Sequence, residues 1–224
     1  MNHIIGDSRV KGLKDIKLTL DVTEVCSKPG ARIADLLDTV DYLTILHHGL
    51  ENARTHFYVW VGICDITVRL RKGNYQEVIF KELDAHRRSK IFKDLDTLES
   101  KIKNEYGVPI FCPIIPLSLS VWNQTLIKHH KTSHLDHSSQ YHSMQTKLEQ
   151  EVITFNDYII KKNMINNIRT PMLSQDFTHN RGKSKGQIKA YYKYSNLVDG
   201  CHPDKKISSK FTKSIIQAIK KNRS

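Results

Sequence analysis

Short apolar runs alternate with longer amphipathic stretches along the 224-residue chain. An apolar run bounded by Gly or Pro is typical of a strand, whereas apolar residues three or four positions apart predict a helix. This pattern predicts strands over residues 3–5, 16–25, 57–61, 109–116 and 190–192. It predicts helices over residues 32–50, 75–106, 145–166 and 206–222, with Gly107 capping the second. The polar stretches 129–142 and 171–186 are expected to be irregular.

The alternation of strands and helices predicts an α/β fold with a mostly parallel central sheet. The run 57–61 consists of aromatic and β-branched residues only, which is typical of a strand that helices cover on both faces. No internal repeat and no linker-like composition divides the sequence. We therefore expect residues 1–224 to form a single domain.

Three groups of reactive residues directly follow predicted strands. They are Ser8, the segment 62–65, and the Asp199-to-His202 stretch. In an open parallel sheet, ligands bind beyond the carboxyl ends of the strands, so these groups are candidates for one site. A serine nucleophile needs a base, and the base needs a group that orients it. Ser8, His202 and Asp199 supply these three roles. The alternatives are that Ser8 is a turn or helix-capping residue and that Asp199-Gly200 is an ordinary turn.

Four short motifs occur in order along the chain. They are Gly6-Asp7-Ser8, the glycine of Pro29-Gly30, Gly62-Ile63-Cys64-Asp65, and Asp199-Gly200-Cys201-His202-Pro203. In this order and at these spacings the chain resembles the SGNH/GDSL hydrolase superfamily over nearly its whole length. The resemblance implies a three-layer α/β/α flavodoxin-like fold, with Ser8 as nucleophile and His202 as base. It also implies an oxyanion hole formed at Ser8, Gly30 and Cys64, and it implies no metal and no cofactor.

Cys64 departs from the pattern of that superfamily, which has asparagine at this position. A thiol is a weaker hydrogen-bond donor than an amide. Loss of one oxyanion donor typically lowers kcat by about 10²–10³-fold. The expected function is thus a serine hydrolase of slow turnover that cleaves a small ester, for example an acetyl ester. The alternative is a catalytically weakened binding domain associated with nucleic acid, as in the esterase-like domains of some mobile genetic elements. For Cys64 itself, the alternatives are a small buried residue, a redox partner of Cys201, or the nucleophile.

The positive charge of the chain is concentrated at one end. The net charge is +12, and residues 179–224 contribute +10 of it, from twelve Lys and Arg and two Asp. This basic C-terminal portion contains Asp199 and His202, so its field predicts an anionic ester substrate or a nucleic-acid partner. The alternative is a solvated basic helix.

Several other classes of protein are not supported by the sequence. No apolar run approaches 18 residues, so no membrane span is expected. The first residues lack the pattern of a secretory signal, which predicts an intracellular protein, cytoplasmic or nuclear, with reduced thiols. The four cysteines form no C-x-x-C pair. A zinc site among the histidines of residues 129–142 remains an alternative to a solvated loop.

Overall fold

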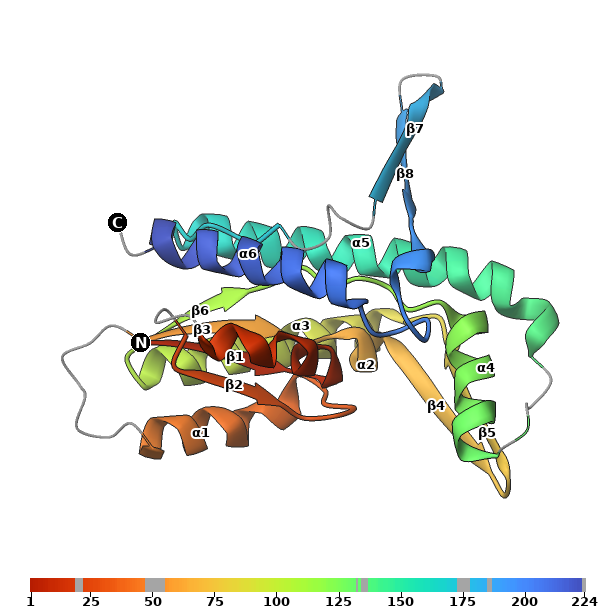
Figure 1. Cartoon of the computed structure of the whole chain (residues 1–224), viewed down its shortest axis with the longest axis horizontal. Coiled ribbons are helices and arrows are strands. Elements are labelled where there is room, and N and C mark those ends of the chain that lie inside the picture. Colours follow the sequence, from red (N-terminus) through yellow and green to blue (C-terminus); the bar gives the residue numbers. More distant parts are fainter. Residues whose placement is uncertain are drawn as a thin grey trace.

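Four parallel strands form the centre of the molecule in the order β2-β1-β3-β6 (Figure 1). They are β1 (Asn2–Gly6), β2 (Glu24–Ser27), β3 (Thr55–Trp60) and β6 (Gly107–Phe111). The computed structural model describes residues 1–18, 22–46, 55–131, 133, 137–172, 178–184 and 187–222. Parallel pairing aligns Gly6 with Ser27 on one side and with Trp60 on the other, so the carboxyl ends of these strands lie together. The chain segments that carry the predicted site leave the sheet at this edge.

Helices cover both faces of the sheet. Helices α5 (Tyr141–Ile165) and α6 (Lys205–Asn222) run along one side, and α1 (Leu37–Leu46) runs along the other (Figure 1). Helix α3 (Ala85–Asn104) contacts α1 and β6. The two central strands are apolar because both of their faces are covered; for example, Tyr58 and Trp60 of β3 are fully buried. The predicted three-layer α/β/α architecture is therefore confirmed. None of the described helices is long and apolar enough to cross a bilayer.

Two buried asparagine side chains form hydrogen bonds with backbone groups at and just beyond the end of β6, where strand pairing ends. Asn163 of α5 accepts a hydrogen bond from Phe111 N at 3.1 Å and donates one to Phe111 O at 2.7 Å. Asn156, two turns earlier, makes the same pair of bonds to Ile114 at 2.8 Å each. A side-chain amide carries one acceptor and one donor group and can replace a neighbouring strand. In this way α5 covers the open edge of β6 and fixes the chain that continues beyond it.

The predicted helix over residues 75–106 is wrong in its first third. Residues 67–80 form an antiparallel hairpin of β4 (Thr67–Lys72) and β5 (Tyr75–Phe80), and α3 begins only at Ala85. Strand β5 is stabilised because α4 (Leu119–His130) and α5 pack on it. Asn123 of α4 bonds to both the N–H and the C=O of Val78 at 2.7 Å. Gly107 starts β6 instead of capping α3, and Tyr106 adopts the left-handed conformation there (φ 57°).

Other boundaries also differ from the predicted pattern. Residues 16–18 belong to a 3-10 helix, η1 (Ser8–Leu18), so the predicted strand 16–25 is reduced to β2. The stretch 129–142 contains the end of α4, the 3-10 helix η3 (Ser138–Gln140) and the start of α5. The stretch 171–186 contains β7 (Thr178–Ser184), which pairs with β8 (Gln187–Tyr192) in a hairpin away from the central sheet. Residues 47–50 of the predicted first helix lie outside the described residues.

Candidate active site

The end of β1 presents Ser8 at the carboxyl edge of the sheet. A Cβ atom on Gly6 would lie 2.1 Å from Trp60 O, so only glycine allows β1 and β3 to approach this closely at their ends. The chain then turns, and Asp7 N bonds to Trp60 O at 3.3 Å. Ser8 starts η1, with its side chain half-buried at the surface of the sheet edge.

The loop before α6 brings a histidine and a carboxylate to this serine. His202 Nε2 lies 2.9 Å from Ser8 Oγ, and His202 Nδ1 lies 2.6 Å from Asp199 Oδ2. The three predicted residues therefore form one hydrogen-bonded chain, although Ser8 and His202 are 194 positions apart in the sequence. The edge of the Trp122 ring packs against the His202 ring at a centroid distance of 5.5 Å. This contact, with the Asp199 bond, restricts the imidazole to one orientation.

Backbone bonds hold the loop 199–203 in a tight turn. Val198 N bonds to His202 O at 2.8 Å, and Ser118 N bonds to Gly200 O at 2.7 Å. Gly200 has φ of 85°, and a Cβ there would lie 2.7 Å from Trp122 N. Glycine is therefore required both by the conformation and by the space.

The electrostatic setting of Asp199 favours its ionised form. Partial burial opposes ionisation, but the His202 ring and the backbone N–H groups of His202 and Cys201 all donate to the carboxylate. These bonds outweigh the burial and lower the pKa of Asp199 below its usual range. Asp199 is therefore a carboxylate at neutral pH, as an orienting group for an imidazole must be.

Asp7 and Arg9, which flank the serine, form a buried ion pair that the sequence analysis missed. Arg9 Nε and Nη2 donate to the two oxygens of Asp7 at 2.9 and 2.5 Å, and Arg9 Nη1 donates to Ile115 O at 3.0 Å. Both side chains are at most 2% exposed. Arg9 Cζ also lies 5.5 Å from the centroid of the Trp60 ring. The sequence does contain a signal for this pair: an acidic and a basic residue lie two positions apart, directly after a predicted strand.

The second and third motifs are joined by Asp65. Its carboxylate is buried in the short helix α2 (Ile63–Ile66) and accepts the Ile33 N–H at 3.1 Å. This bond ties the chain after Gly30 to the chain after β3. Burial raises the pKa of Asp65 to about 7, against the opposing effect of the Ile33 bond. Sequence reasoning gave Asp65 no role, because its partner is a backbone group 32 positions away.

Of the predicted oxyanion residues Ser8, Gly30 and Cys64, only Ser8 lines the pocket at the site. Ser8 lines an open pocket of about 470 Å³, whose other lining residues are Arg9, Lys11, Gly12, Pro29, His202 and Pro203. Gly30 (φ 73°) follows the pocket-lining Pro29, whereas Cys64 is partly buried and is not among the residues that line the pocket. Burial and the nearby Asp7 raise the pKa of the Cys64 thiol to about 11, so it stays protonated at neutral pH. The four cysteines are free thiols.

The histidine-rich stretch is divided among different surroundings. His129 and His130 end α4, whereas His137 Nδ1 contacts Glu77 at 2.6 Å. His134 lies outside the described residues. Within the part of the chain that the structure describes, no group of three His, Cys, Asp or Glu side chains is arranged to hold a metal ion.

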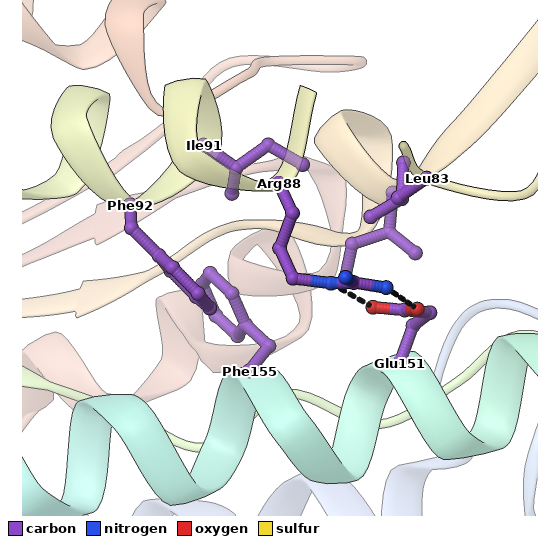
Figure 2. Close-up of a pocket in the computed structure, with 7 residues that line it drawn as sticks. Leu83, Arg88, Ile91, Phe92, Glu151 and Phe155 are labelled. Carbon is purple, nitrogen blue, oxygen red and sulfur yellow. Dashed lines mark hydrogen bonds and ion pairs between the residues drawn. The ribbon is translucent and has the colours of Figure 1, made fainter. Parts of the chain in front are cut away.

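A second cavity lies between α3 and α5 and is structural in character (Figure 2). The Arg88 guanidinium and the Glu151 carboxylate line it together and form two direct hydrogen bonds, at 2.5 and 3.2 Å. Phe92, Ile91 and Phe155 form its apolar wall. Its volume of about 10 Å³ is that of a single water site, so it takes no larger ligand.

The fold of this chain resembles that of several solved structures. A GDSL-like lipase from Bacteroides thetaiotaomicron superposes with a TM-score of 0.61 at 14% identity, covering 98% of this chain and 87% of that one. A member of the lipolytic G-D-S-L family from Veillonella parvula gives 0.57 at 10% identity, with 97% of each chain covered. The C-terminal domain of the Drosophila Oskar protein gives 0.51 at 14% identity, covering 97% and 87%. No model of a protein family matches the sequence.

These likenesses define the class of the fold: a three-layer α/β/α architecture shared with ester hydrolases. More narrowly, the chain has the SGNH/GDSL hydrolase fold over almost its full length.

Proposed function

We propose that this protein is a serine hydrolase of the SGNH type that cleaves a small ester, for example an acetyl ester. The observation that carries the proposal is the hydrogen-bonded chain from Asp199 through His202 to Ser8, at 2.6 and 2.9 Å, beside an open pocket. A half-buried carboxylate, an imidazole and a hydroxyl in this geometry are the groups that activate a serine nucleophile.

In the proposed reaction Ser8 Oγ attacks the acyl carbon while His202 Nε2 takes the hydroxyl proton. His202 then gives this proton to the leaving alcohol, and the acyl group remains on Ser8. A water molecule, deprotonated by His202, attacks the acyl-enzyme and releases the acid and free Ser8. Asp199 accepts the Nδ1–H throughout and stabilises the imidazolium that forms in each half-reaction.

The oxyanion that develops in both steps needs hydrogen-bond donors. We assign this role to the backbone N–H groups of Ser8 and Gly30, with Cys64 Sγ–H as a weak third donor. The buried Arg9 guanidinium is paired with Asp7 and bonds to Ile115 O, so it fixes the chain beside Ser8 and adds no net charge there. Because a thiol stands where an amide would donate more strongly, we expect kcat about 10²–10³-fold below that of an enzyme with the amide.

The pocket indicates which esters fit. A pocket of about 470 Å³ that opens to solvent beside Ser8 has room for a small ester. Lys11, an exposed cation on the pocket wall, favours substrates with a negatively charged group near the ester.

The test is labelling with a fluorophosphonate, which reacts only with an activated serine, together with hydrolysis of a p-nitrophenyl acetate. The wild-type chain is expected to take up the probe and to release p-nitrophenol. Ser8→Ala should lose both signals and keep the melting temperature of the wild-type chain. The control variant Ser209→Ala, on the exposed face of α6, should keep both signals. Absence of labelling in the folded wild-type chain would refute the proposal, as would equal labelling of Ser8→Ala.

A further inference from the structure

Helix α6 carries a stripe of lysines along its outer face. Its 18 residues include six lysines and no acidic residue. Four of them lie at intervals of three, four or seven residues, and we call these four the lysine stripe: Lys206, Lys210, Lys213 and Lys220. Gln217 occupies the position of the same face between the last two. At this spacing the side chains share one face of the helix. The stripe runs about 21 Å along the helix axis.

The opposite face of α6 is fixed to the sheet. Ile207, Phe211, Ile215 and Ile219 are buried, and the Phe211 ring meets Trp60 of β3 edge-on at 5.1 Å. Asp204 Oδ1 accepts the Ile207 N–H at 2.7 Å and caps the first turn. The lysines therefore stand on a rigid base, which reduces the entropy lost when they bind a partner.

Three lysines of the stripe differ from several lysines of the other long helices. On α3 and α5, Lys90, Lys103 and Lys162 lie 2.6–2.7 Å from a carboxylate of Asp94, Glu99 and Asp96 respectively. Lys206, Lys213 and Lys220 form no ion pair with any residue in the described ranges. Their charges are compensated only by solvent ions, which a polyanion can release.

A groove beside the stripe adds hydrogen-bonding groups. It has a volume of about 450 Å³ and lies between α6 and the chain at 169–172. Arg169, Lys213, Ser214 and Gln217 line it, so it combines cations with neutral polar groups. The Asn222 side chain holds Arg169 in place through bonds to its N–H at 2.9 Å and to its C=O at 3.3 Å. The basic hairpin β7–β8, with Arg181 and Lys189 in its sequence, rises from the same side of the molecule (Figure 1).

We infer that the lysine stripe and the adjacent groove bind the phosphate backbone of a nucleic acid. A row of cations with one side chain per turn complements a polymer with evenly spaced negative charges, and the polar groups of the groove can donate to phosphate oxygens. A membrane surface is a poorer match, because a helix that binds in the bilayer interface needs a free apolar face. The apolar face of α6 is covered by the sheet. The inference does not depend on the proposed hydrolase activity.

The test is fluorescence anisotropy of a labelled single-stranded RNA of about 20 nucleotides, titrated with the full chain between about 50 and 200 mM salt. The stripe variant replaces Lys206, Lys213 and Lys220 by Gln. It is expected to reduce the slope of log K against log[salt] by about 2, since each lost phosphate contact on a single strand contributes about 0.7.

The control variant carries the same loss of charge elsewhere. It replaces Lys72, Lys93 and Lys128, exposed on β4, α3 and α4, by Gln. It should change affinity and slope much less than the stripe variant. Equal effects of the two variants, or no binding of RNA by the wild-type chain, would overturn the inference. Tighter, stripe-dependent binding to phosphatidylserine vesicles than to RNA would also overturn it.

A measurement of ester hydrolysis separates this inference from the proposed function. Hydrolysis of the neutral p-nitrophenyl acetate by the stripe variant is expected to equal that of the wild-type chain. A chain that binds RNA through the stripe without hydrolysing esters would support the inference and refute the proposed function.

Discussion

Asp65 gives the protein a pH-dependent stability that one substitution should remove. The carboxylate is buried at 8% exposure, accepts the Ile33 N–H at 3.1 Å, and lies near Arg32, Asp35 and Asp94. Burial raises its pKa from 3.8 to about 7, although the Ile33 bond and Arg32 act in the other direction. The folded state therefore binds the Asp65 proton more tightly than the unfolded state does.

The sign and size of the effect follow from linkage. Because the folded-state pKa is raised, the stabilisation from the proton is complete below pH 3.8 and is lost as the pH rises to about 7. Each pH unit in this window costs about 1.4 kcal/mol. Between pH 5 and pH 8, the wild-type chain is thus expected to lose about 2.5 kcal/mol from this one group.

The measurement is urea unfolding of the wild-type chain and Asp65→Asn at pH 5, 6, 7 and 8. An asparagine keeps an oxygen that can accept the Ile33 N–H and has no proton to lose. The variant should therefore gain stability over the wild-type chain as the pH rises, by about 2.5 kcal/mol from pH 5 to pH 8, with unchanged m-values. The difference between the two chains isolates Asp65 from every other titrating group. A difference that stays constant across this range would refute the reasoning.

Three further substitutions test the site and the fold. Cys64→Asn should raise kcat for p-nitrophenyl acetate by about 10²-fold, because an amide donates to the oxyanion more strongly than a thiol, with Cys112→Ser as the control for loss of a thiol. Gly200→Ala places a Cβ 2.7 Å from Trp122 N at a positive φ and should lower the free energy of unfolding by about 2 kcal/mol, which a urea titration would measure. Asn123→Ala leaves the N–H and C=O of Val78 without their partner and should cost about 2–4 kcal/mol, while Gln124→Ala on the exposed face of the same helix should have little effect. An unchanged unfolding midpoint for either destabilising variant would contradict the packing described above.

Much of the central architecture could be predicted from local pattern. Residues 57–61 are apolar throughout and precede Gly62, and the short run Ile4-Ile5 ends at Gly6, so both strands are evident from the local pattern. Helices α5 and α6 likewise carry apolar residues at helical spacing over many turns. Strand β5 was predicted as the start of a helix because its apolar residues satisfy both periods over a short span. Its pairing is decided by α4 and α5, and by Asn123 in particular, which the local sequence does not contain.

The sequence by itself determined which residues could carry chemistry, since Ser8, Asp199 and His202 each follow a recognisable turn signal near a predicted element. It also determined that the positive charge lies in the last fifth of the chain. Only the tertiary structure decided that Ser8 and His202 meet at 2.9 Å, that Asp7 neutralises Arg9, and that Asp65 joins two loops. The physical reason is that hydrogen bonds and ion pairs act over a few ångströms in space. Their partners here are set by the order of strands in the sheet and by the packing of α6 on it, which periodicity along the chain does not encode.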